Sequence, residues 1–226
     1  MTHSRFTTAT VTCPQCGKTF EARRWRTLVV EENHEAAAAA SEGNLTTVKC
    51  PHCSAEVELE YPFVLVSTVR RAILHYLPSS ADELNEKTIR PYLEDDLHLA
   101  DAIADSSGVR GEPFTLRFTA QMSDFIEKLM ILADGLDDRV VELMKHVARE
   151  HGRAAGMPID HVRYYREGER QLVLAYDDKT ELLGAQDFDR AMHDRVKASI
   201  SNLPEGMIVD GKWAAEVFAG LTAEAH

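Results

Sequence analysis

All four cysteines of the chain lie in two short motifs, Cys13-Pro14-Gln15-Cys16 and Cys50-Pro51-His52-Cys53. Two residues between a pair of cysteines allow a tight turn to direct both sulfur atoms at one metal ion. Two such turns supply the four thiolates that structural Zn²⁺ prefers, and they leave no position open for a reacting water. The spacing therefore predicts one structural Zn²⁺ with four ligands: Cys13, Cys16, Cys50 and Cys53.

The residues around the cysteines fit such turns. Proline fixes φ and lacks an N–H, so Pro14 and Pro51 stiffen the turns while later residues provide the amides that face the sulfurs. Gly17 follows the first motif, where a positive φ is often required and glycine adopts it freely. Ser54 holds the corresponding position after the second motif. We expect the second turn to accept strain or to have a different shape.

Two other interpretations of the cysteines are open. The second motif resembles the active-site tetrapeptide of periplasmic thiol oxidases of the thioredoxin superfamily, where the first cysteine opens a helix and exchanges disulfides. Here residues 54–61 alternate apolar and polar, which indicates a strand, and a second CxxC pair would be surplus. A pair of structural disulfides is the other alternative. The first residues show no secretory signal pattern, so we expect a cytoplasmic protein with reduced thiols.

Composition narrows the possible partners. The chain has 226 residues, of which 44 % are apolar and 27 % charged, as in ordinary globular proteins. Its formal net charge of −12 disfavours non-specific binding to nucleic acid or to an anionic membrane surface. The longest apolar runs are far too short to span a bilayer. We therefore expect no membrane association.

The first third of the sequence predicts a small antiparallel β module. Residues 5–12 and 18–30 favour strands on either side of the first cysteine motif, and residues 45–49 and 55–60 do so around the second. Between them, the run of alanines that Gly43 follows predicts one short helix. A strand pair at 62–67 and 70–77 ends at Pro78. We interpret residues 1–78 as a zinc-ribbon-like module with a short helical insert.

These features resemble the CpXC family, bacterial proteins named for paired Cys-Pro-x-Cys motifs with a long insertion between them. The two motifs, the helix-and-glycine insert over Glu35 to Asn44 and Tyr61-Pro62 carry the resemblance over roughly residues 9–78. A weaker similarity continues to Ile126-Glu127-Lys128 and Gly135-Leu136-Asp137-Asp138-Arg139. The resemblance implies metal binding by the four cysteines. It implies no particular reaction, and Ser54 departs from the glycine often found after such pairs.

Residues 79–113 predict an acidic helical connector. Ser79-Ser80 can cap a helix from Ala81 to about Tyr92, interrupted by Pro91. Between residues 81 and 105 there are eight Asp or Glu against Lys87 and Arg90. Carboxylates with a nearby histidine can bind a divalent cation or act as acid and base, whereas the alternative is a solvated helix face. The candidate residues are Asp95, Asp96 and His98.

Residues 114–226 predict an α+β region. A strand at 114–119 precedes two amphipathic helices that join at Gly135 as an αα-hairpin, with Leu136, Val140, Leu143, Met144 and Val147 as the buried stripe of the second. A β-hairpin follows at 162–166 and 171–176. Asp187 is expected to cap a helix whose buried side carries Phe188, Ala191, Met192, Val196 and Ile200. Asp210 is expected to cap the last helix, which carries Trp213, Val217, Phe218 and Leu221.

Three classes of function remain open. The first is a zinc-stabilised binding or adaptor protein whose C-terminal region presents a surface to a protein partner. The second is a nucleic-acid-binding protein, in which Arg23-Arg24-Trp25-Arg26 would combine phosphate contacts with base stacking. The third is an enzyme with a site in the acidic stretch, or at Glu142, His146 and Glu150 on one helix face. No phosphate loop, nucleophile elbow or zinc-protease motif is present, so no catalytic residue is predicted.

Overall fold

The computed structural model describes residues 3–80, 83–107, 113–200 and 202–224. Contacts between Cα atoms divide the chain into two compact units, residues 1–126 and residues 127–226, and each is described by itself. Within the described ranges the structure holds six α-helices, two antiparallel sheets and one mixed sheet. The α+β class predicted from the sequence is therefore confirmed. None of the described helices is long and apolar enough to cross a bilayer.

The first unit is built on a five-stranded sheet with the order β1-β2-β5-β6-β7. The strands are β1 (Arg5–Thr12), β2 (Thr19–Val29), β5 (Phe63–Ser67), β6 (Ala72–Tyr76) and β7 (Thr115–Thr119). Strand β2 runs parallel to β5 and β6 runs parallel to β7, whereas the other neighbours are antiparallel. The predicted strand pair before Pro78 thus lies at the centre of a larger sheet.

The core of this unit surrounds strands β5 and β6, in which every residue is buried. On one face, Val29, Val66 and Ile73 pack with the half-buried Leu99 and Leu116. On the other face lie aromatic side chains, among which the ring centroids of Phe63 and Phe125 are 5.0 Å apart. Burial on both faces explains why these two strands read as continuous apolar runs.

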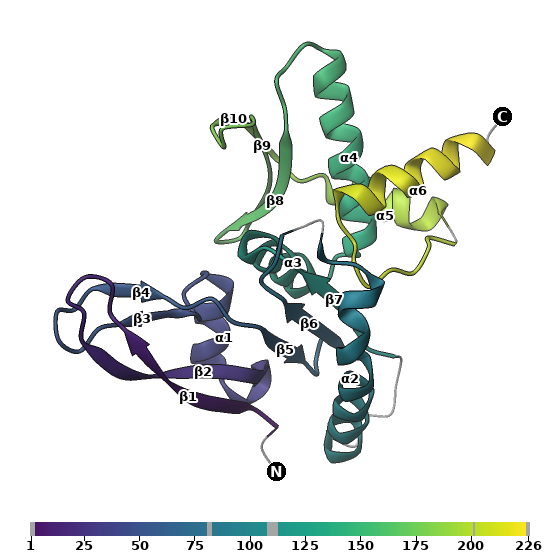
Figure 1. Cartoon of the computed structure of the whole chain (residues 1–226). Helices are drawn as coiled ribbons and strands as arrows, with labels where there is room; N and C mark the ends of the chain where they lie inside the picture. Colours follow the sequence, from purple (N-terminus) through teal and green to yellow (C-terminus); the bar gives the residue numbers. More distant parts are fainter. Residues whose placement is uncertain (1–2, 81–82, 108–112, 201, 225–226) are drawn as a thin grey trace. The chain divides into compact units, whose positions relative to one another are not determined.

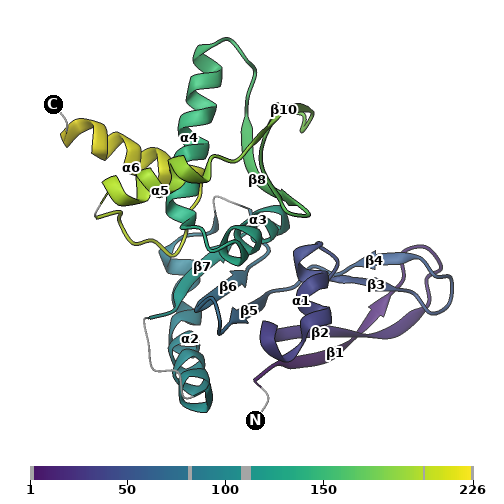
Figure 2. The same ribbon diagram turned by 180° about the vertical axis from the view of Figure 1, so that it is seen from behind.

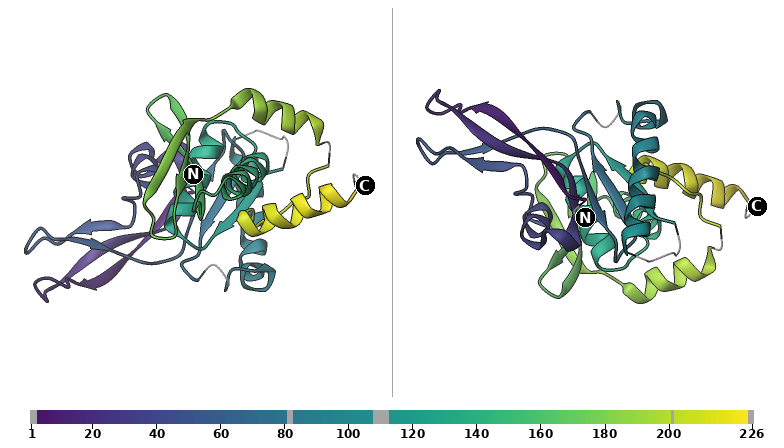
Figure 3. Two further views of the ribbon diagram at one scale, coloured as in Figure 1. Left: turned by 90° about the horizontal axis from the view of Figure 1, so that it is seen from above. Right: turned by 90° about the horizontal axis from the view of Figure 1, so that it is seen from below.

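Two β-hairpins carry the cysteine motifs at their turns. The β1–β2 hairpin holds the first motif, and the hairpin of β3 (Thr47–Lys49) and β4 (Glu56–Glu58) holds the second. The two hairpins extend side by side (Figures 1 and 3). The segment between them forms η1 (Val30–Glu32) and α1 (His34–Ser41). Gly43, with φ of +76°, follows α1 as the sequence predicts for a helix end.

Helix α2 differs from the prediction for the acidic connector. It spans Glu86–Ser107 and continues through Pro91 instead of stopping there. Asn85 begins it, since its side chain accepts from the N–H of Lys87 and Thr88, while the Thr88 hydroxyl accepts from the Asn85 N–H. This reciprocal cap outweighs the predicted cap at Ser79-Ser80. Pro91 is the sixth residue of the helix and removes one of its backbone hydrogen bonds.

The second unit packs helices against a three-stranded antiparallel sheet with the order β10-β9-β8 (Figure 2). Its strands are β8 (His161–Glu167), β9 (Arg170–Tyr176) and β10 (Leu182–Asp187). Helix α3 (Met122–Ala133) enters this unit and α4 (Asp138–Ala154) follows after Gly135, with φ of +69°, as the predicted αα-hairpin. The core includes Ile131, Val141 and Tyr164. Strand β10 was not predicted, because its short LLGAQD run lacks β-branched residues.

Two predicted helix faces in this unit need correction. In α4, Val141 is buried instead of Val147, which is 46 % exposed. Helix α5 spans Arg190–Ser199 and is capped by Asp189 instead of Asp187, because Asp187 ends β10. His193 is the buried residue of α5, whereas Met192 is exposed. Helix α6 (Gly211–Glu224) is capped as predicted, since Asp210 accepts from the N–H groups of Lys212 and Trp213.

Candidate metal centre

The two cysteine turns have the same backbone hydrogen bonds. In the first, the Cys13 N–H donates to the Lys18 carbonyl at 2.9 Å and the Gly17 N–H donates to the Cys13 carbonyl at 2.9 Å. In the second, the Cys50 N–H donates to Ala55 at 2.8 Å and the Ser54 N–H donates to Cys50 at 2.8 Å. Each turn therefore closes a hairpin and holds the two cysteines of its motif close together.

The turns bring all four sulfur atoms together. The Sγ atoms of Cys13 and Cys53 are 3.7 Å apart, and those of Cys16 and Cys50 are 3.8 Å apart. All four lie within 4.8 Å of one another, which makes them the one group of three or more Cys, His, Asp or Glu in the described ranges that can hold a metal ion. The cysteines are free thiols, because these separations far exceed a disulfide bond of about 2.05 Å.

The electrostatics of the cluster favour a cation at its centre. The Cys16 N–H is the main group that lowers the pKa of Cys13 to about 7, against the opposing effect of desolvation. The Ala55 N–H acts in the same direction on Cys53, but desolvation and contacts with the other three thiols raise the pKa of Cys53 to about 12. The sulfurs cannot all ionise side by side without a positive charge between them.

The apolar core beside the cluster is small. The two buried cysteines, Cys13 and Cys50, form it with Val57, and a ring of half-buried residues packs around them. Strands β3 and β4 have only three residues each. So little buried apolar surface cannot hold two hairpins together by itself, which is the situation in which a metal ion contributes folding energy.

The structure does not fit the redox interpretation of Cys50-Pro51-His52-Cys53. The motif lies in a turn between the paired strands β3 and β4, and no helix begins at Cys50. A thioredoxin-like site requires that helix to lower the pKa of its first cysteine. The strand expected after the motif is observed as β4.

Ser54 has a φ of +61°, whereas Gly17 has a φ of +70° at the same point of the first turn. The predicted strain at Ser54 is thus confirmed. We expect Ser54→Gly to raise the free energy of unfolding of the hairpins by about 1 kcal/mol, because glycine adopts this conformation without steric cost. We expect Gly17→Ala to lower it by about 1 kcal/mol, although the added Cβ meets nothing within 4 Å. Denaturant titrations of zinc-loaded protein measure both changes, and equal or reversed signs would contradict the account.

The fold and the four-cysteine cluster define the class: an α+β protein whose two N-terminal hairpins bring together four thiols that could hold a metal ion. A family model described as CpXC protein matches residues 11–145, more than half of the chain. The chain belongs to this family, as its motifs suggested. No curated protein and no solved structure shows significant similarity to the chain.

The acidic residues of α2 do not form a site in the part of the chain that the structure describes. Asp95 and His98 line a cavity of the first unit, and the side chain of Asp96 lies outside the described ranges. On α4, Glu142 is buried among lysines, and Glu150 lies 3.4 Å from Arg149. His146 contacts the ring of Phe218, with centroids 5.1 Å apart. Glu142, His146 and Glu150 therefore share a helix face but do not form a metal site.

The arginine-rich segment of β2 is arranged differently from a stacking platform. Trp25 is only 8 % exposed and its ring meets that of Phe6 edge to face, at 5.7 Å between centroids. Arg23 covers the Phe6 ring, with its Cζ 4.3 Å from the centroid, and Arg24 covers Tyr61 at 4.6 Å. Trp25 therefore offers little exposed surface on which a base could stack.

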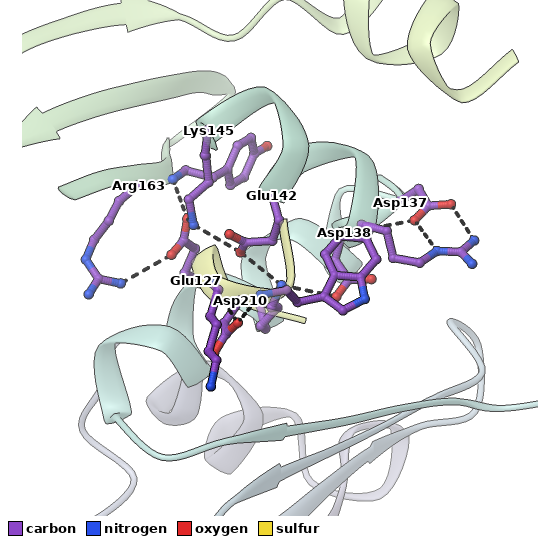
Figure 4. A network of polar contacts seen from close by, with 12 residues as sticks. Glu127, Asp137, Asp138, Glu142, Lys145, Arg163 and Asp210 are labelled. Carbon is purple, nitrogen blue, oxygen red and sulfur yellow. Dashed lines mark hydrogen bonds and ion pairs between the residues drawn. The ribbon is translucent and has the colours of Figure 1, made fainter. Parts of the chain in front are cut away.

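The second unit contains a buried ionic network that was not predicted from the sequence (Figure 4). Lys128 Nζ lies 3.1 Å from Asp138 Oδ2 and 3.0 Å from Glu142 Oε1. Lys145 Nζ lies 3.0 Å from the same Glu142 oxygen and 2.7 Å from Glu127 Oε1. Lys128, Asp138, Glu127 and Glu142 are each at most 4 % exposed. The network joins α3 and α4 through their charged side chains.

Strand β8 completes this network. The Glu127 carboxylate accepts from the Tyr164 N–H at 2.6 Å and from the Arg163 guanidinium at 3.2 Å. With Arg163 included, the network links three carboxylates with three cations. Glu127, Lys128 and Asp138 belong to the segments of weaker similarity to the CpXC family, and the family match ends at Lys145. Charges of both signs at helical spacing in these segments were the signal that could have indicated the network.

Acid is expected to weaken this network. Desolvation would raise the pKa of Glu142, but Lys128 and Lys145 outweigh it and hold the pKa below its ordinary value of 4.5. The ion pairs therefore stabilise the fold above about pH 4.5 and lose that contribution as the pH falls through the lower folded-state pKa. Hydrogen exchange of the α4 and β8 amides between pH 7 and 3 should show this loss. The dependence of this stability on pH should become weaker in Glu142→Gln and stay the same in Glu150→Gln. An unchanged pH dependence in Glu142→Gln would contradict the role given to Glu142.

Proposed function

We propose that this CpXC protein is a binding or adaptor protein whose N-terminal hairpins are held together by one structural Zn²⁺. The ligands would be Cys13, Cys16, Cys50 and Cys53. The observation that carries the proposal is the group of four sulfur atoms within 4.8 Å of one another. Tetrahedral Zn²⁺ with Zn–S bonds of about 2.3 Å places its sulfurs about 3.8 Å apart, and the two measured contacts are 3.7 and 3.8 Å.

A structural role for the metal follows from the ligand set. Four thiolates fill the shell of Zn²⁺, so no position remains for a substrate or an activated water. The paired turns and the small core beside them support a zinc-ribbon-like description of the two hairpins. Free thiols suit a reducing compartment, which supports the expected cytoplasmic location.

The second unit offers the surface for a protein partner. All six residues of β10 are exposed, and this strand forms one edge of its sheet. On this strand Leu182 is 56 % exposed and Leu183 is 42 % exposed. An edge strand with apolar side chains can pair with a strand of another chain.

Metal analysis and affinity capture test the two parts of the proposal separately. We expect one zinc per chain in protein purified without added metal. Capture from the host should recover a partner with the unaltered chain and lose it with Leu182→Lys/Leu183→Lys. The control is Val69→Lys, which changes an apolar residue of the first unit that is 76 % exposed. Identical capture by all three proteins, or no specific capture, would contradict the adaptor role.

A further inference from the structure

The first unit contains a cavity of about 780 Å³ that is separate from the cysteine cluster. Residues of β1, β2, β5, β6 and α2 line it, and none of them is a cysteine. The volume falls within the range of about 300–1,000 Å³ that is usual for small-molecule sites. The cavity is therefore large enough for a ligand of nucleotide size.

One side of the cavity carries an excess of positive charge. Arg5 comes from β1, and Arg24 and Arg26 come from β2, whereas Asp95 is the one carboxylate among the lining residues that the structure describes. Among the described residues none of these three arginines forms an ion pair with a carboxylate. The chain as a whole has a net charge of −12. Three arginines in one lining favour the binding of an anion, because an anion between guanidinium groups offsets their mutual repulsion.

Arg24 is already held in position for such an anion. Its Cζ lies 4.6 Å from the ring centroid of Tyr61, which is only 4 % exposed and accepts a hydrogen bond from the Trp25 N–H at 3.3 Å. A guanidinium that stacks on a ring keeps the N–H donors along its edge available. Those donors match the oxygens of a phosphate in pairs, which a lysine cannot do.

Other parts of the lining are apolar and aromatic. Pro62, Leu77 and Leu99 line the cavity together with the half-buried Tyr92. The Tyr92 ring lies 5.7 Å from the ring of His75, between centroids. A ligand that fits both kinds of lining has an anionic group and an apolar or aromatic body.

We propose that this cavity binds a nucleotide, with its phosphates against Arg5, Arg24 and Arg26 and its base against the apolar part of the lining. This site goes beyond the structural zinc and the protein partner, and it depends on neither. It also gives the arginines of β2 a role that does not need Trp25 as a stacking surface.

Calorimetric titration of the zinc-loaded protein with ATP in magnesium-free buffer tests the proposal. We expect a single ATP site whose affinity falls as salt is added, weaker binding of pyrophosphate, and no binding of uncharged adenosine. Arg24→Gln and Arg26→Gln should each weaken ATP binding about tenfold, because each removes charge-assisted hydrogen bonds. Arg23→Gln removes the same charge from the same strand outside the lining, and it should leave the affinity unchanged.

Three results would overturn the proposal. They are the absence of ATP binding, an equal loss in Arg23→Gln and Arg24→Gln, or tighter binding of oligothymidylates that increases with their length. The last result would indicate a nucleic-acid strand running over the surface instead of a mononucleotide in the cavity. Zinc content and melting are measured for each variant, so failure of the nucleotide site is distinguishable from failure of the metal centre.

Discussion

Replacing Cys13 with serine is expected to abolish stable zinc binding and to unfold the parts of the two N-terminal hairpins nearest the cysteine turns. Cys13 is fully buried and its sulfur contacts that of Cys53 at 3.7 Å. Structural zinc sites contribute on the order of 10 kcal/mol to folding, which is comparable with the whole stability of a domain, about 5–15 kcal/mol. The small core around Val57 cannot replace that contribution.

Hydrogen exchange with mass spectrometry locates the effect. In Cys13→Ser, peptides that cover β3, β4 and the ends of β1 and β2 nearest the first cysteine turn should exchange rapidly, as they should in the unaltered protein after removal of zinc by a chelator. Peptides that cover β8 and β9 serve as the internal control and should keep their protection, because these strands belong to the other unit. Unchanged zinc content and unchanged exchange in Cys13→Ser would refute the structural role of the metal.

Replacing Lys128 with methionine is expected to cost about 3–5 kcal/mol of stability in the second unit. The substitution keeps an unbranched side chain of similar length but removes the contact of Asp138 with the Lys128 ammonium at 3.1 Å. It also leaves Glu142 with Lys145 alone. The buried carboxylates of Asp138 and Glu142 would each lose their contact with the Lys128 ammonium. Helices α3 and α4 would therefore lose a polar contact that joins them.

The measurement is the urea-induced unfolding of the second unit, followed by its hydrogen exchange. Lys179→Met is the matched control, because Lys179 is exposed and should give no change. Adding Asp138→Asn to Lys128→Met removes one of the uncompensated charges and should recover part of the loss. A loss of stability below about 1 kcal/mol in Lys128→Met would show that these contacts contribute no more than ordinary surface ion pairs, and it would contradict the prediction.

The cysteine turns were predictable because their geometry is local. Two cysteines, a proline and a following residue with positive φ determine each turn, and the contrast between Gly17 and Ser54 gave the position of the strain. The four sulfurs were expected to meet because one metal satisfies both turns. The four sulfurs come together only if the insert between the hairpins folds back. The short helix of this insert and the glycine after it were also predicted from the sequence.

The central sheet was less predictable. Each strand from β5 to β7 was expected. The parallel pairing of β6 with β7 was not predicted, because it joins residues that α2 separates in the sequence. Helix α2 was expected to break at Pro91, since proline is a reliable breaker in the middle of a helix. The cap at Asn85 begins the helix later than expected, which makes Pro91 its sixth residue, and the helix continues through it.

The buried ionic network shows a different limit. Charged residues on a helix normally face solvent, so Glu142 was first considered as a ligand on an exposed face. Its burial depends on Lys128 and Lys145, whose positions are determined by the packing of α3 against α4 and β8. The same reasoning applies to the cavity arginines, whose grouping depends on the register of β1 with β2 and on helix α2.

The metal centre is tested most directly by X-ray absorption at the zinc edge of the purified full chain, with zinc quantified in the same sample. The account predicts one zinc per chain with four sulfur neighbours at about 2.3 Å and no oxygen or nitrogen in the first shell. A chain without zinc, or a zinc with mixed sulfur and oxygen or nitrogen neighbours, would contradict it.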